Sequence, residues 1–449
     1  MRDLALILGT AFYLPMALRF PATGVLCWAW FSIMNPHRQL YGFAAGQPFN
    51  SIIAVATLVG WLASRERKRW TPDAMPWLLL ALVAWMTLDT FFAANPSYSW
   101  VFWDRVMRIF ALIFMVLVLI STKARIHAMI WVIVISLGFY GVKGGVFTIA
   151  HGGHAIVFGP SDSVYGDNNH LALAVVTELP LALYLARNTR AWWLRALVVV
   201  AMALQVVMVF GSYSRGGVIA LGVTMAMLLL RSDRKMAYGA LALLVVAGGL
   251  MVMPDSFYER LNTVNSLDTD DSFQGRVTAW RVAYLYATDH FPFGAGLYGP
   301  QIKAVFGTYF PDEAVHAAHS IYFQMLGEHG YVGLAIYLVL LAMGLRNAGI
   351  VVRQTRGQPG LEWARDLADM IRISLIAFCV GGAALSMAYS DVYLILIALL
   401  STLRELTQPE AVAARARARK RRLMLGAPPE PAPASLRPER YPDAANKPA

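Results

Sequence analysis

Apolar segments follow one another from residue 4 to residue 403, separated by polar stretches, and this pattern constrains the fold more than any other feature. The chain is 58% hydrophobic and 14% charged, with a mean hydropathy of +0.52, whereas about 25% of the residues in a soluble domain are charged. A helix needs about 20 mostly apolar residues to cross a bilayer core about 30 Å thick. The sequence therefore predicts an all-α, polytopic membrane protein. The predicted spans, about 12–13 in number, are 4–18, 25–34, 51–63, 75–92, 107–121, 127–142, 171–186, 193–211, 217–230, 236–253, 321–345, 367–387 and 392–403.

Clusters of Lys and Arg indicate how these spans are oriented, because such clusters are retained on the cytoplasmic side. Two predicted spans separate each cluster from the next; the clusters lie at 65–69, 123–125, 187–195, 231–235 and 346–356. The stretches expected on the outer side are therefore 93–105, 144–169, 212–216 and 254–319. Pro15, Arg19 and Pro21 interrupt the first two apolar segments, which leaves open whether these form two short spans or one broken hairpin.

The C-terminal residues 404–449 differ in composition, with a basic run at 414–422 followed by a Pro- and Ala-rich stretch. We expect residues 1–403 to form one transmembrane domain and 404–449 to form a disordered cytoplasmic tail. A basic run beside a last span is attracted to anionic lipids. Membrane lipids therefore account for the net charge of +11, and no nucleic-acid partner is expected.

The interval 254–319 is long for a connection between helices, and such loops are usually functional. It contains eight acidic and four basic residues. Lys and Arg are usually retained on the cytoplasmic side, so arginines in this outer interval favour an anionic ligand. A surface salt bridge would also explain Arg276. Arg276 and Arg281 are five positions apart on a predicted helix, about 140° around its axis. We therefore do not expect them to contact one ligand equally.

Arg215 lies in the sequence GSYSRGG, between two predicted spans at the outer side. The flanking glycines allow a sharp turn and a close approach of the backbone to a ligand. The simpler alternative is that Arg215 extends to phospholipid headgroups.

His319 precedes the span 321–345, with Ser320 placed to cap it. A helix N-terminus disfavours a positive charge and so lowers the pKa of a nearby imidazole, which can then accept a proton near neutral pH. His319 is therefore a candidate general base; the alternative is an interfacial histidine bonded to headgroups or backbone.

Other polar residues on the outer side could also contact a ligand. His316 and His319 are three positions apart, but no HExxH pattern accompanies them, and we expect neither a metal nor a cofactor. No phosphate-binding loop or nucleophile elbow is present in the sequence. Lys143, Asn168, Asn169 and His316 are candidate pocket residues, although the two asparagines are more simply interpreted as helix caps.

The segments SRGG, GRVTAW, PFGAGLYG and HSIYFQMLGEHGYVG, in this order and spacing, resemble those of the O-antigen ligase and polymerase superfamily of bacterial envelope glycosyltransferases. The segments WAWFSIMNPHRQLYGFA and WVIVISLGFYGVKGGVFT resemble its subgroup of O-glycosylation ligases associated with the exosortase system. The resemblance covers roughly residues 1–403.

This resemblance implies a helical enzyme of the Gram-negative inner membrane with a large periplasmic loop. Such enzymes transfer a glycan from undecaprenyl diphosphate to an acceptor hydroxyl. By motif, the essential histidine of the family corresponds to His319 and its essential arginines to Arg215 and Arg276, while Arg281 is a secondary candidate. The resemblance also implies inversion at the sugar carbon.

Three acceptors remain open: lipid A core oligosaccharide, a protein Ser or Thr, and the end of another glycan. The subgroup resemblance favours ligase over polymerase, and we favour lipid A core slightly over protein. A transporter or flippase is the alternative of another class; it should show internal symmetry and broken helices near the bilayer midplane.

Overall fold

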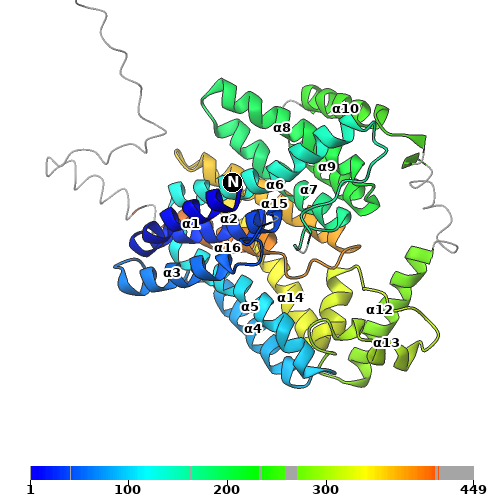
Figure 1. Cartoon of the computed structure of the whole chain (residues 1–449). Coiled ribbons are helices and arrows are strands. Elements are labelled where there is room, and N and C mark those ends of the chain that lie inside the picture. The colour runs from blue at the N-terminus through cyan, green and yellow to red at the C-terminus, as the bar shows by residue number, and fades with distance from the viewer. Residues whose placement is uncertain are drawn as a thin grey trace, which may run out of the picture.

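The computed structural model describes residues 2–40, 42–161, 163–231, 235–255, 257–258, 271–409 and 413, and within them the regular elements are all helices (Figure 1). Two are short 3-10 helices, η1 (Pro36–Gln39) and η3 (Gly299–Gln301). The α-helices are α1 (Arg2–Arg19), α2 (Pro21–Met34), α3 (Phe49–Ala63), α4 (Met75–Phe91), α5 (Pro96–Leu119), α6 (Lys123–Ala150), α7 (Asn168–Asn188), α8 (Trp192–Gly211), α9 (Arg215–Arg231), α10 (Lys235–Met251), α12 (Asp271–Asp289), α13 (Lys303–Tyr309), α14 (Ile321–Gln354), α15 (Glu362–Gly382) and α16 (Asp391–Thr407). The predicted all-α class is confirmed.

Each of the thirteen predicted spans coincides with a helix, namely α1 to α10 and α14 to α16. Four of these helices, α6, α7, α8 and α14, are long and apolar enough to cross a membrane by length and composition. Helices α2, α3 and α4 are shorter but also apolar. An all-α polytopic membrane protein is thus what the chain forms.

Two predicted outer loops are shorter than expected. Helix α5 begins at Pro96, where the side chain of Asn95 caps it by accepting a hydrogen bond from the Tyr98 amide at 3.2 Å. Helix α6 continues past Lys143 to Ala150. Polar side chains at these helix ends mark where hydropathy falls, but they do not end a helix whose backbone can continue hydrogen bonding.

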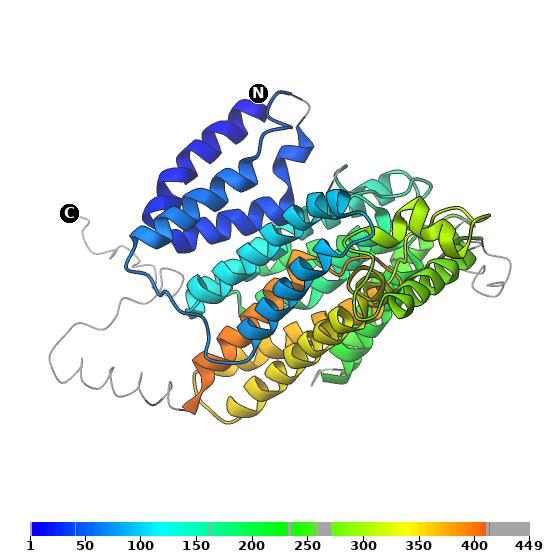
Figure 2. The same ribbon diagram turned by 90° about the horizontal axis from the view of Figure 1, so that it is seen from below.

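The N-terminal region contains two helices, α1 and α2, separated at Phe20. Pro15 lies inside α1, and the break comes at Phe20, with Pro21 in the first turn of α2. Helix α3 returns against both. A Cβ atom at Gly60 would lie 2.5 Å from the Leu18 carbonyl oxygen, so only glycine lets α3 approach α1 this closely. Figure 2 shows α1, α2 and α3 as a group beside the remaining helices.

The core is formed by helices that are apolar on all sides. In α7, 83% of the apolar window is buried, and α16 is buried from Asp391 to Leu403. Such helices belong in the interior of a large helical protein. Helix α8 packs against α6 through glycines, since a Cβ atom at Gly145 would lie 2.1 Å from the Leu204 carbonyl oxygen.

Ion pairs join four of the five predicted basic clusters to neighbouring segments at one end of the bundle. These pairs are Arg125 with Glu66 at 2.6 Å, Arg67 with Glu405 at 2.9 Å, Arg187 with Asp366 at 3.5 Å and Arg231 with Asp369 at 2.6 Å. Helices α12 and α13 lie at the opposite end (Figure 2). The interval 254–319 thus contains α12, η3 and α13. The basic run predicted at 414–422, like most of the tail, lies outside the described residues.

Candidate active site

His319 lies immediately before α14, in the segment that leads from α13 to this helix. Its backbone is left-handed, with φ 41°. His is among the residue types that adopt this conformation most readily after glycine. Ser320 occupies the N-cap position as predicted, but its side chain makes no capping hydrogen bond. The first turn of α14 is closed instead by the backbone, since the Gln324 amide donates to the Ser320 carbonyl at 2.8 Å.

Four charged or titratable side chains shift the pKa of His319, and they come from three parts of the chain. Arg276 lies on α12, Asp167 and His170 lie at the start of α7, and His316 precedes His319 in the same segment. Burial lowers the pKa of His319 below its ordinary value, and the Arg276 guanidinium lowers it further. Only Asp167 acts in the opposite direction. The imidazole is therefore held neutral at neutral pH, as a general base requires.

The His319 Nδ1 atom is buried and has no hydrogen-bond partner within the described part of the chain. A buried polar atom without a partner is costly and uncommon.

Helix α12 is held against the His316–His319 segment by two close contacts. Gly275 lies directly on the His316 ring, since a Cβ atom there would be 2.8 Å from the ring Nδ1. Trp280 donates from Nε1 to the Ala318 carbonyl at 2.6 Å, and its ring stacks on Phe323 of α14 with centroids 5.0 Å apart. These contacts explain why Arg276, next to Gly275, comes close to His319.

Arg281 lies on another side of α12 and is exposed. It borders an open apolar groove of about 330 Å³ with Val277, Trp280, Tyr284 and Phe323. Arg276, by contrast, is half-buried and acts on His319. The two arginines face different surroundings, as the spacing of five residues led us to expect.

Arg215 is the first residue of α9, after a tight turn in which Tyr213 has φ 56°. The turn is tied to α7, because Asn168 donates from Nδ2 to the Ser212 carbonyl at 2.7 Å. It also lies beside the end of α15, where a Cβ atom at Gly216 would be 3.6 Å from the Cβ of Ala384. The end of α15 in turn contacts the first residue of α14, since a Cβ at Gly382 would lie 2.8 Å from Ile321. Arg215 is thereby placed at the same end of the bundle as His319.

The remaining pocket candidates have separate roles. Asp167, not Asn168 or Asn169, caps α7, because its Oδ1 accepts hydrogen bonds from the amides of Asn169 at 2.9 Å and His170 at 3.2 Å. This corrects the expectation that the asparagines are caps. The carboxylate competes better for amide donors because it is charged. Lys143 lies on an exposed face of α6 among apolar side chains such as Phe139 and Phe147, and the structure does not bring it to His319.

A second group of polar residues, which the sequence did not single out, surrounds a break in α14. Gly330 has φ 65° and ψ −170°, which divides α14 into two parts. The carbonyls of Gly327 and Glu328 accept hydrogen bonds from the amides of Ala295 at 2.8 Å and Gly296 at 2.9 Å. The segment 293–299, which includes the PFGAGLYG motif residues Phe293 to Gly299, therefore supplies the donors that the broken helix lacks.

Glu328 and His329, at this break, are 2% and 0% exposed and contact Asp89 and Tyr389 from distant parts of the chain. The signal that could have found them is the sequence LGEHG, which places two ionisable residues between glycines within an apolar segment. Ionisable residues in such segments commonly mark functional sites.

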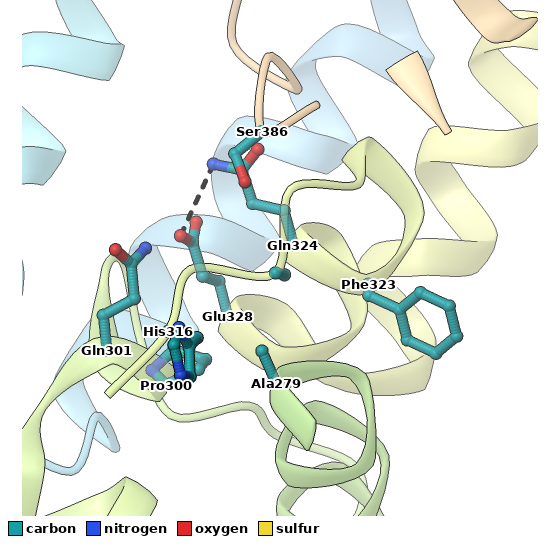
Figure 3. Close-up of a pocket in the computed structure, with 9 residues that line it drawn as sticks. Ala279, Pro300, Gln301, His316, Phe323, Gln324, Glu328 and Ser386 are labelled. Carbon is teal, nitrogen blue, oxygen red and sulfur yellow. Dashed lines mark hydrogen bonds between the residues drawn. The ribbon is translucent and has the colours of Figure 1, made fainter. Parts of the chain in front are cut away.

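A small pocket is lined both by residues of the His316–His319 segment and by residues near the break in α14 (Figure 3). It has room for about 10 Å³, near the minimum for one water molecule. Figure 3 shows Glu328 and Gln324 reaching it from α14, with His316 and Gln301 on the facing side and Ser386 beside Gln324. Its walls are Ala279, Pro300, Gln301, His316, Ala318, Phe323, Gln324, Glu328 and Ser386.

Comparison with known proteins divides the chain into two matched parts. Residues 1–190 match a family of unknown function (DUF5935), and residues 197–338 match the family described as O-Antigen ligase. No curated protein matches the chain. The second match includes Arg215, Arg276, Arg281, His316 and His319. Residues 197–338 of this helical membrane bundle, which include the His319 region, are thus similar to the family described as O-Antigen ligase.

Proposed function

We propose that the protein is an inverting membrane glycosyltransferase that moves a glycan from undecaprenyl diphosphate to an acceptor hydroxyl, with lipid A core oligosaccharide as the acceptor. The reaction would take place on the periplasmic face of a Gram-negative inner membrane. One observation carries the proposal: His319, whose pKa is lowered by burial and by the Arg276 guanidinium, lies inside the segment that matches the O-antigen ligase family. The subgroup of ligases associated with the exosortase system stays a prediction of the sequence.

In the proposed reaction, His319 takes the proton of the acceptor hydroxyl while its oxygen forms a bond to the anomeric carbon. The bond from this carbon to the diphosphate oxygen breaks, and undecaprenyl diphosphate leaves with the electron pair. Arg276 and Arg215 hold the diphosphate, because guanidinium groups match phosphate oxygens and stay charged. Arg281 is a secondary candidate for this contact. The arginines supply the positive charge that stabilises the leaving group, and the proposal includes no metal or cofactor.

The transporter alternative draws on one specific observation, the break in α14, because transporters build substrate sites at broken helices near the bilayer midplane. The 24 residues of α14 after Gly330 are about 36 Å long at 1.5 Å per residue, enough to cross a bilayer core unaided. The break therefore fits the outer boundary of the membrane better than its midplane. This favours an enzyme over a transporter.

A reconstitution experiment tests the proposal. The full chain in lipid vesicles receives an undecaprenyl-diphosphate glycan as donor, with lipid A core, a Ser/Thr-rich protein and a free glycan offered in parallel. We expect glycosylation of lipid A core. Transfer to the protein or glycan alone would replace the acceptor, whereas donor crossing the bilayer without any transfer would favour the flippase.

The neighbours of His319 predict opposite pH effects for two substitutions. The base acts in its neutral form, so activity falls as the pH drops through the pKa of His319. Arg276→Gln removes a positive neighbour, which raises this pKa and moves the acid limb of kcat/KM to higher pH. Asp167→Asn removes the negative neighbour but keeps a good capping residue, and should move the limb to lower pH.

The matched control for this pair is Arg281→Gln, because Arg281 is exposed and borders the apolar groove on another side of α12. The acid limb of the kcat/KM profile of Arg281→Gln should coincide with that of the wild type. If Arg276→Gln and Asp167→Asn moved the limb in the same direction, His319 would not be the group that titrates.

A further inference from the structure

Four side chains at the break in α14 form one continuous hydrogen-bond network. Asp89 Oδ2 lies 2.9 Å from His329 Nδ1, and His329 Nε2 lies 2.8 Å from the Tyr389 hydroxyl. The Tyr389 hydroxyl contacts Glu328 Oε2 in turn. Asp89 comes from α4, Glu328 and His329 from α14, and Tyr389 from the connection between α15 and α16. None of these residues has a part in the proposed transfer step.

Both ends of this hydrogen-bond network are held in place by further hydrogen bonds. Asp89 Oδ1 accepts from the Gly294 amide at 2.9 Å, and the His329 carbonyl accepts from Trp85 Nε1 at 2.9 Å. At the other end, Gln324 donates to Glu328 Oε1 at 3.5 Å and accepts from the Ala388 amide at 3.1 Å. Groups fixed so firmly from several elements keep their geometry when a proton moves, which is what proton transfer requires.

Three protons can form the three hydrogen bonds between these four side chains in two arrangements. In one arrangement, a doubly protonated His329 donates to Asp89 and to the Tyr389 oxygen, while Tyr389 donates to an ionised Glu328. In the other, His329 keeps only its Nδ1 proton, Tyr389 donates to His329 Nε2, and a protonated Glu328 donates to the Tyr389 oxygen. The two arrangements have the same net charge and the same contacts. They differ only in the shift of two protons, so that His329 loses a proton and Glu328 gains one.

Glu328 connects this hydrogen-bond network to the pocket, because it lines the pocket together with His316, Gln324 and Ser386 (Figure 3). Asp89 and His329 are fully buried and are not among the pocket-lining residues. A water or hydroxyl in the pocket can therefore exchange a proton with Glu328, and through Glu328 and Tyr389 with His329. The pocket also borders the segment that carries His319, since Ala318 is one of its walls.

We propose that Glu328, Tyr389, His329 and Asp89 form a proton relay that takes up, at Glu328, the proton that glycosyl transfer leaves on His319. This inference rests on the proposed function. After each transfer, protonated His319 gives its proton to a water in the pocket, and this water gives a proton to Glu328. Before this uptake Glu328 is ionised and His329 carries only its Nδ1 proton, so the uptake gives the three-proton state described above, and the shift through Tyr389 exchanges the added proton between Glu328 and His329. His319 is again neutral, and Glu328 returns the proton through the pocket water to solvent before the next transfer. No bond other than those to hydrogen forms or breaks.

Other titratable groups face the relay from the elements packed around it. Tyr286 of α12 lies within electrostatic reach of Asp89, Tyr298 within reach of Glu328, and Tyr393 of α16 within reach of Tyr389. His316 faces Glu328 across the pocket. Any pH titration of the relay must therefore be assigned with single substitutions.

The test uses the full chain in lipid and two readouts. The first is the infrared carbonyl band of a protonated carboxyl, followed against pH without turnover. Glu328→Gln should remove one component of this band. Tyr389→Phe keeps the ring but removes the linking hydroxyl, and should move the midpoint of the Glu328 component by about one pH unit or more, as expected for coupled sites. The matched control is Tyr322→Phe, which removes a hydroxyl that donates to the Cys379 carbonyl at 3.0 Å and lies outside the relay, and it should leave the midpoint in place.

The second readout is the kinetics of glycan transfer. We expect Tyr389→Phe to lower kcat by about tenfold or more, the lower range for a positioned proton transfer, with KM unchanged and an altered pH profile. An unchanged Glu328 midpoint in Tyr389→Phe, or a wild-type kcat and pH profile, would overturn the relay. Absence of transfer in the wild-type protein would overturn the proposed function alone, because the infrared coupling is measured without turnover.

Discussion

Replacing His319 with asparagine is expected to lower kcat/KM for glycan transfer by about 10²–10⁴-fold, the usual contribution of a positioned general base. Asparagine tolerates the left-handed backbone of this position, where φ is 41°, but cannot take up a proton. His319→Ala should have the same effect on transfer, with a further cost of about 1 kcal/mol in stability for a left-handed alanine. Donor binding, measured as KM, should change little because the diphosphate is assigned to the arginines.

The control for this substitution is His154→Ala, which removes an exposed histidine that does not act on His319. It should transfer glycan at the wild-type rate. The thermal unfolding of His319→Asn in detergent should match that of the wild type, so that lost transfer is not lost folding. Full transfer by a folded His319→Asn protein would contradict the general-base role and with it the proposed mechanism.

Most of the helical architecture could be predicted from hydropathy alone. Thirteen apolar segments became thirteen helices because a chain that must satisfy its backbone hydrogen bonds in lipid has few alternatives to the helix. Helix ends were less predictable. Lys143 marked an end for hydropathy, yet α6 continues to Ala150, because a helix can extend beyond the apolar core of the bilayer.

The residues around His319 could be predicted in part, because the motifs SRGG, GRVTAW and HSIYFQMLGEHGYVG are local in the sequence. Their mutual placement could not, since it depends on packing contacts such as Gly275 on His316 and Gly216 beside Ala384. The relay was missed altogether. Asp89 and His329 are 240 positions apart, and an aspartate near the end of an apolar segment carries no sign of its partner.

Gly330→Ala is expected to destabilise the protein strongly. Gly330 has φ 65° and ψ −170°, a region of backbone space that is essentially restricted to glycine. A Cβ atom there would lie 2.3 Å from the Pro292 carbonyl oxygen and 2.7 Å from the Phe293 carbonyl carbon. These are backbone atoms, which cannot move aside as a flexible side chain can. Strain and overlap together should cost about 3 kcal/mol or more.

The loss should extend to function, because the break at Gly330 frees the carbonyls that bind Ala295 and Gly296 and places Glu328 beside Tyr389. The matched control is Gly222→Ala in α9, where a Cβ atom would meet no heavy atom of another described segment within 4 Å. It should not lower stability, since alanine favours a helix over glycine by about 1 kcal/mol. Thermal unfolding of both variants in lipid, followed by circular dichroism, compares them directly. Equal midpoints for Gly330→Ala and Gly222→Ala would show that α14 can straighten without cost, and the break would then not be what holds Glu328 and His329 in position.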